Sequence, residues 1–212
     1  MTRALFRPAV AAGVFAILAG FGMASPAAAQ SGTPPPKLDK PAVGASKKAV
    51  FELADDLDGL FAQLSRTRDK KRSQHIADRI WAEWRTSDSR SIDLLLHWAA
   101  GAMSRRDFPT ALDLLDQAVV LRPRYAEGWN QRATLHFMME NFGKSISDIE
   151  RVLALEPRHF GALSGLATIF ERIERKDDAL KVWYRALAVF PAMESAQSAV
   201  IRLEEELAGS RI

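Results

Sequence analysis

The sequence predicts an all-α protein, a right-handed solenoid of helical hairpins with three clear repeats, a degenerate N-terminal hairpin and a C-terminal capping helix. From Lys47 onward apolar residues recur at spacings of three and four, which is the period of an amphipathic helix. No sustained alternation of apolar and polar residues indicates a strand. Pro123, Pro157 and Pro191 stand 34 residues apart, and such a period is typical of stacked helical pairs.

Composition and charge exclude several classes of protein. Hydrophobic residues make up 48% of the 212 and charged residues 26%, so the chain is not disordered throughout. A formal net charge of +3 is too small for a dedicated nucleic-acid binder, which needs many uncompensated cations. The absence of cysteine excludes disulfides, thiol nucleophiles and cysteine-ligated metal centres.

Residues 1–29 have the order of a secretory signal peptide. Arg3 and Arg7 precede an uncharged run at 9–24, and small residues follow at 27–29. The run has 16 residues, whereas a helix needs about 20 to span a bilayer. We therefore expect cleavage near Ala29, a periplasmic location and no stable membrane insertion afterwards, with an uncleaved N-terminal anchor as the alternative.

Residues 30–46 contain four prolines and few large apolar groups. Such a composition favours an extended, unpaired backbone, and it predicts a Pro-rich linker. The alternative is a Pro-rich ligand for another domain.

Residues 47–90 are predicted to form an N-terminal helical hairpin, a degenerate repeat that covers the N-terminal end of the solenoid. Apolar residues form one stripe over 48–66. Counting back one period places Ala77 and Trp81 in the columns of small and large residues, but Ser89 stands where the proline would be.

Three repeats follow, at 91–125, 126–159 and 160–193, and a capping helix is predicted at 194–208. Small residues recur in register, which lets two antiparallel helices approach closely. The registered small positions are Ala99, Ala133 and Ala167, then Ala111, Ser145 and Ala179. A proline closes each copy because it cannot continue the helix. A solenoid also needs a terminal helix with a polar outer face.

These columns resemble the tetratricopeptide repeat (TPR). The match is best at 126–159, where Trp129, Ala133 and Phe142 take the family's early aromatic, small and turn-aromatic positions and Pro157 closes the unit. His136 departs from the pattern, since the family usually has tyrosine there. The region 120–175 is similar to exported TPR proteins of alphaproteobacteria.

The resemblance implies that the first helix of each pair lines a concave groove, in which a peptide or protein segment lies. The positions that this transfer assigns are Leu96, Ala100, Met103, Asn130, Gln131, Thr134, Phe137, Met138, Ser164, Thr168 and Arg172. Some TPR co-chaperones bind an acidic C-terminus through Lys, Arg and Asn in these columns. Here the residues are mostly apolar or small and polar, which favours an apolar or aromatic peptide, with methionines as adaptable contacts. The alternative for Phe137 is a place in the core.

No motif of catalysis or metal binding occurs. The four histidines have no pair one helical turn apart, although His97 and His136 lie on first helices of adjacent repeats. Gly161 and Gly165 flank a serine within a predicted helix, without the spacing of a nucleophile elbow. We therefore expect no enzyme, no metal and no cofactor.

Five cations surround Asp69 at 66–72, between two predicted helices. The simpler interpretation is a solvated loop, and the alternative is a site for an anionic partner such as lipid headgroups or an acidic protein. Taken together, the sequence predicts a protein-interaction adaptor or scaffold of the cell envelope. The alternative is a structural subunit that forms homo-oligomers through its N-terminal hairpin, with Trp81 and Trp84 as interface anchors.

Overall fold

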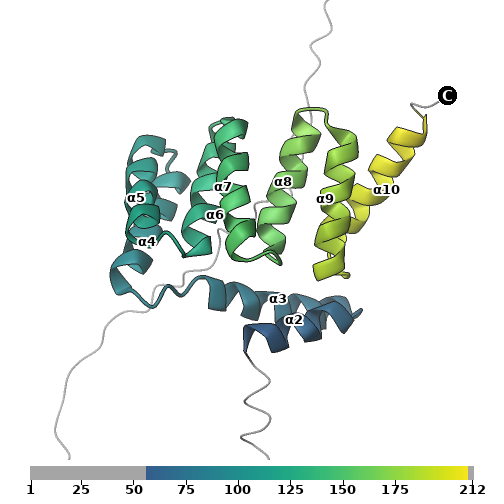
Figure 1. Cartoon of the computed structure of the whole chain (residues 1–212), viewed down its shortest axis with the longest axis horizontal. Helices are drawn as coiled ribbons and strands as arrows, with labels where there is room; N and C mark the ends of the chain where they lie inside the picture. Colours follow the sequence, from purple (N-terminus) through teal and green to yellow (C-terminus); the bar gives the residue numbers. More distant parts are fainter. Residues whose placement is uncertain (1–55, 210–212) are drawn as a thin grey trace, which may run out of the picture. The chain divides into compact units, whose positions relative to one another are not determined.

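The computed structural model describes residues 56–209, which form nine α-helices and no strand (Figure 1). The first two helices are α2 (Leu57–Arg66) and α3 (Lys70–Trp84). The helices of the three repeats and the last helix are α4 (Arg90–Ser104), α5 (Phe108–Leu121), α6 (Ala126–Met138), α7 (Phe142–Leu155), α8 (Phe160–Arg172), α9 (Lys176–Val189) and α10 (Glu194–Gly209). The fold confirms the predicted all-α solenoid of helical hairpins.

The registered small residues lie where the two helices of a pair cross. Ala99 and Ala111 are fully buried between α4 and α5, and Ala167 and Ala179 are fully buried between α8 and α9. In the middle pair the hydroxyl of Ser145 donates a 2.7 Å hydrogen bond to the carbonyl oxygen of Ala133, so a polar residue fits this position. Because the side chains are short, the helix backbones approach closely over the whole crossing.

The turn within each pair repeats its backbone geometry as well as its sequence. Arg106, Glu140 and Glu174 follow the first helices, 34 residues apart, and have φ of 59°, 58° and 59°. This left-handed conformation ends a helix and lets the following amide bond back to a carbonyl of the last turn. The amide of Asn141, for example, donates to the carbonyl oxygen of His136 at 2.9 Å.

The first helices of successive pairs approach one another. Helix α4 contacts α6, and α6 contacts α8, in addition to the contacts of each helix with its own pair. Stacked hairpins that approach on one side curve toward that side. The first helices α4, α6 and α8 therefore line the concave face of the solenoid.

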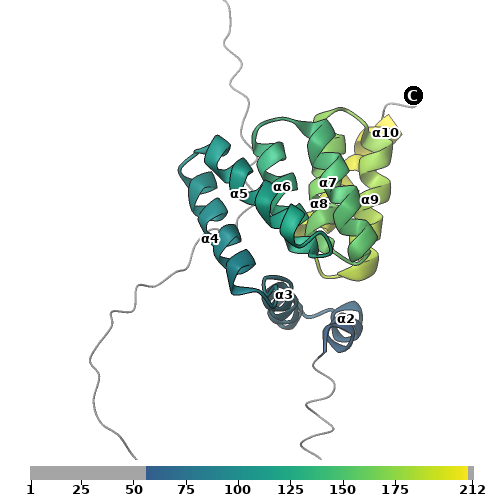
Figure 2. The same cartoon turned by 60° about the vertical axis from the view of Figure 1, so that its left-hand side comes forward.

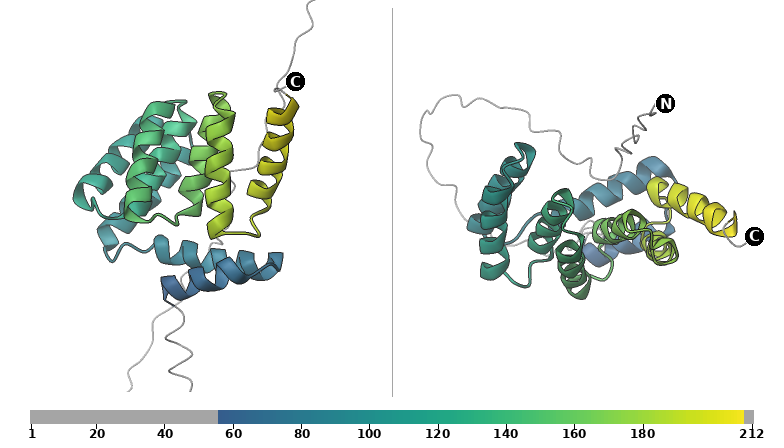
Figure 3. Two further views of the ribbon diagram at one scale, coloured as in Figure 1. Left: turned by 45° about the vertical axis from the view of Figure 1, so that its right-hand side comes forward. Right: turned by 90° about the horizontal axis from the view of Figure 1, so that it is seen from above.

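The N-terminal hairpin does not cover the N-terminal end of the solenoid, and that prediction is wrong. Helices α2 and α3 lie across the edge formed by the loops between repeats, nearly perpendicular to the repeat helices (Figures 1 and 2). Their apolar faces share one core with Phe160, Phe190 and Ala192, which lie at the α7–α8 and α9–α10 connections. The same arrangement is visible from the side and from above (Figure 3).

Aromatic stacking and ion pairs hold the hairpin at this edge. The ring of Trp84 stacks on that of His159, with centroids 3.9 Å apart and planes at 8°. Trp81 packs edge-on against both His159 and Phe160. Asp58 pairs with Arg158 at 2.6 Å. Both tryptophans therefore face their own chain, so they cannot serve as the predicted anchors of an oligomer.

The missing proline explains the change of direction. The link between α3 and α4 includes Asp88 at φ 57°, and Ser89 is extended at φ −139° and ψ 108°. The hydroxyl of Ser87 donates to Asp93 and also to the carbonyl oxygen of Ser89. This link sends α3 beneath the repeats instead of beside α4.

The predicted signal peptide (1–29), the Pro-rich linker (30–46) and the start of the predicted hairpin (47–55) lie outside the described residues. Within the described part of the chain, no helix is both long enough and apolar enough to cross a bilayer.

Candidate functional site

Eight of the eleven residues predicted to line a groove lie at or near the surface of the concave side. Those on α4 and α8 are Ala100, Thr168 and Arg172, and those on α6 are Asn130, Gln131, Thr134, Phe137 and Met138. The other three are buried, with Leu96 4%, Met103 6% and Ser164 4% exposed. Their assignment to a binding surface is wrong, because in this register the same side chains fill the cores of the first and third repeats.

A polar cluster lies where α6 begins. The buried carboxylate of Glu127 accepts hydrogen bonds from the side-chain amides of Asn130 (3.0 Å) and Gln131 (3.4 Å). The imidazole of His159 lies against the same carboxylate, with Nε2 3.6 Å from Oε2. Its Nδ1 accepts from the backbone amide of Ala162 at 3.1 Å, which leaves Nε2 to carry the proton toward Glu127.

The threonines in the middle of this face bond to their own helices. The hydroxyl of Thr134 donates to the carbonyl oxygen of Asn130 at 2.9 Å, and that of Thr168 donates to the carbonyl oxygen of Ser164 at 2.8 Å. Such bonds turn the methyl groups, rather than the donors, toward a ligand. This part of the face therefore offers apolar contact.

The far end of the face is aromatic and basic. Phe137 packs against Phe142 with ring centroids 5.8 Å apart, and the guanidinium of Arg172 lies 5.7 Å from the Phe137 ring. Met138 beside them is 39% exposed. Phe137 is half-buried, so it belongs partly to the core and partly to the surface, between the two predicted alternatives.

The histidine on the other side of α6 belongs to an ion cluster. Arg132 bridges Asp116 (2.7 Å) and Asp148 (2.7 Å), and Nε2 of His136 lies 3.9 Å from Asp148. Burial lowers the pKa of His136, and the cations Arg132 and Lys144 lower it further, against the opposite effect of Asp148 and Asp116. This arrangement links α5, α6 and α7 and holds His136 neutral as a packing residue.

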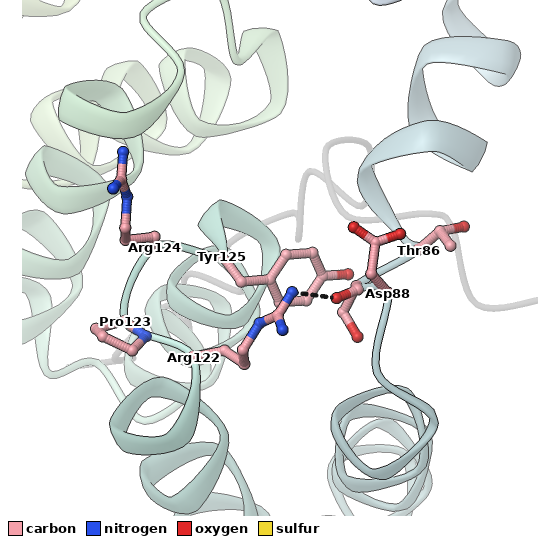
Figure 4. Close-up of a pocket in the computed structure, with 7 residues that line it drawn as sticks. Thr86, Asp88, Arg122, Pro123, Arg124 and Tyr125 are labelled. Carbon is pink, nitrogen blue, oxygen red and sulfur yellow. Dashed lines mark hydrogen bonds between the residues drawn. The ribbon is translucent and has the colours of Figure 1, made fainter.

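A hollow of about 460 Å³ lies between the α3–α4 link and the α5–α6 connection (Figure 4). There Arg122 donates to the carbonyl oxygen of Ser87 at 2.7 Å, while the side chain of Arg124 points away. The hydroxyl of Tyr125 donates to the carbonyl oxygen of Trp84 at 2.8 Å. Burial, with the carboxylates of Glu127, Asp93 and Asp88, raises the pKa of Tyr125, so it remains a donor. The hollow marks a joint between hairpin and repeats.

Within residues 56–209 no group of three histidine or acidic side chains is placed to hold a metal ion. Sequence reasoning missed Glu127, His159 and Trp84, which connect the hairpin to the concave face. A signal existed for Glu127, since it is one turn before Asn130 on the face that the repeat register assigns to ligands. For His159 and Trp84 it was absent, because their contact depends on the position of the hairpin.

No protein-family model matches the chain. A TPR repeat-containing protein of Rhizobium etli is 47% identical over 178 residues, which span 81% of this chain and 87% of the relative. The identical region is long enough to include the greater part of the described helices.

Two solved structures are similar in fold. The first TPR of Spaghetti (RPAP3) bound to the HSP90 peptide SRMEEVD has a TM-score of 0.54 at 19% identity, over 57% of this chain and 95% of that one. The Sgt2 TPR domain from Aspergillus fumigatus has a TM-score of 0.54 at 17% identity, over 58% of this chain and 83% of that one. At such identities the likeness concerns the fold alone.

Proposed function

Because the chain belongs to the tetratricopeptide repeat family, we propose that it is a non-catalytic adaptor or scaffold of the bacterial cell envelope, exported to the periplasm. It would hold a peptide or protein segment on the concave face of α4, α6 and α8. The signal-like pattern of residues 1–29 supports the location. The family and the similar peptide-bound structure support binding as the activity.

The polar cluster at Glu127 carries the choice of ligand. The amide nitrogen of Asn130 is hydrogen-bonded to Glu127 and is therefore engaged within the chain. A carboxylate at this end of the face also repels an acidic C-terminus. Next to it the face offers threonine methyls, Phe137 and the exposed Met138. An apolar or aromatic segment fits this surface better than an acidic one.

The experiment is crosslinked co-purification of residues 30–212 from the native envelope fraction, analysed by mass spectrometry. The test variant is Asn130→Arg with Phe137→Ala, which changes both ends of the α6 surface. The control is Ser147→Arg with Ile201→Ala, since both residues are exposed and lie on α7 and α10. The captured segment is then made as a peptide, and its Kd is measured for all three proteins.

A partner that is lost in the test variant and kept in the control supports the concave face as the binding surface. Equal capture by both variants would show that the partner binds elsewhere. Helix content by circular dichroism must be the same in the three proteins for this comparison.

A further inference from the structure

The turn between α2 and α3 holds the densest charge of the described chain. Residues 66–72 contain five cations and one acid, Asp69. In residues 56–209 outside this turn, 17 basic side chains face an excess of 22 acidic ones. The positive charge of the folded part is thus concentrated at one end of the hairpin, and the remainder is net negative.

Three of these cations converge on one hollow. Its volume is about 440 Å³, and Arg66, Arg68 and Arg72 line it together with Gln63, Thr67, Ala62 and Asp69. The Asp69 carboxylate is occupied at the start of α3, where it accepts from the backbone amide of Arg72 at 2.7 Å. Arg68 donates through Nη1 to the carbonyl oxygen of Ser65 at 2.9 Å, which fixes its guanidinium near the hollow.

The charges around the hollow leave it strongly basic. Lys70 pairs with Glu194 at 2.5 Å, so this cation is largely neutralised. Lys71 is exposed beside it. Each large apolar side chain that is exposed in the described residues lies in 94–201, far from the turn in sequence. A ligand at this turn is therefore bound by charge and hydrogen bonds rather than by apolar insertion.

We propose that this hollow binds the phosphate of an anionic lipid headgroup, and that the protein rests on an anionic membrane surface through the α2–α3 turn. Guanidinium groups bind phosphate oxygens in a bidentate geometry, and three of them here surround one hollow. The net negative remainder of the protein would be repelled from such a surface, which orients the turn toward it. This surface is separate from the concave face and is independent of the peptide proposal.

The test measures binding of residues 30–212, which contain all the described helices, to vesicles of phosphatidylglycerol and of phosphatidylcholine. We expect binding to phosphatidylglycerol alone, weakening as salt rises because the Debye length shortens. Changing Arg66, Arg68 and Arg72 to Gln should weaken binding on the order of 100-fold, since each cation near an anionic surface contributes about 1 kcal/mol. The matched control changes Arg90, Arg124 and Arg185 to Gln, three exposed cations elsewhere.

A second variant changes the same three arginines to Lys. It keeps the charge and removes the bidentate geometry, so we expect affinity between those of the wild-type and Gln proteins, with an unchanged thermal melt. Equal loss in the Gln variant and the control would overturn the site, as would a Gln variant that binds like the wild type. Binding to inorganic phosphate or poly-glutamate without binding to phosphatidylglycerol vesicles would overturn the membrane as the source of the anion.

Discussion

Gly161→Ala tests whether the N-terminal hairpin lies against the loop edge of the repeats. Gly161 is the second residue of α8, and a Cβ added there would lie 2.6 Å from Cη2 and 2.7 Å from Cζ2 of Trp81. Carbon atoms in contact prefer about 3.5–4.0 Å, so the indole would have to retreat by about 1 Å. Trp81 is held edge-on by Trp84, His159 and Phe160, and its ring has little room to move.

The expected cost is about 1–3 kcal/mol in the free energy of unfolding, the usual range for overpacking a rigid site. For a protein of this size about 2 kcal/mol corresponds to a fall of roughly 4–8 °C in Tm. Thermal and urea unfolding followed by circular dichroism measure both quantities.

The sequence supplies a matched control. Gly143 is the second residue of α7, also follows a phenylalanine, and has no heavy atom within 4 Å of its added Cβ. Gly143→Ala should be neutral or stabilising by up to about 1 kcal/mol, because alanine favours a helix over glycine. Combining Gly161→Ala with Trp81→Ala should cost less than the sum of the two single changes. If Gly161→Ala proves as stable as Gly143→Ala, the hairpin does not lie at this edge.

Four further predictions concern single side chains. Arg132→Met should cost about 3–5 kcal/mol because it leaves the buried carboxylate of Asp148 without a cation, whereas Asp116→Asn, at a side chain 51% exposed, should cost less than about 1 kcal/mol; urea unfolding compares them. Trp84→Ala should cost about 3–5 kcal/mol and Trp98→Ala, at a 52% exposed ring, less than about 1 kcal/mol, and equal costs would contradict the burial of Trp84 in the hairpin core. Because the pKa of His136 is lowered in the folded state, the unfolded state binds more protons, and the free energy of unfolding should fall as pH drops from 7 through about 6.5; in His136→Gln this slope should be smaller, as measured by urea unfolding at several pH values. Glu140→Gly should raise the free energy of unfolding by about 0.5–1 kcal/mol, since it relieves a left-handed backbone at a non-glycine residue, and a lower Tm would contradict that reasoning.

Local rules made the repeats predictable. Pro157 ends one unit and Ala133 lets two helices cross, and each of these effects depends on neighbours within one period. The same rules hold for the turns, because a break in the apolar pattern with polar residues marks where each first helix ends. The left-handed residue at Glu140 was not visible in the sequence, since family glycine is absent there and the strain is borne by an ordinary side chain.

The position of the hairpin could not be derived in this way. The apolar stripe of α2 shows that Leu60 and Leu64 are buried, but it does not say against which surface. That choice depends on Trp84 meeting His159, 75 residues later in the chain. The candidate site inherited the same gap, because Leu96 and Met103 were placed by family register, whereas their burial depends on packing within the first repeat.

The brace between Asp58 and Arg158 changes how this solenoid is expected to fold. An open stack of repeats makes contacts between neighbours only, so it can lose its terminal units one at a time. Here a contact across 100 residues joins the first described helix to the third repeat. Closing so long a loop is slow, and its entropic cost is recovered only after the third repeat has formed. We therefore expect the helices synthesised first to dock last, and the hairpin and third repeat to unfold as one cooperative unit.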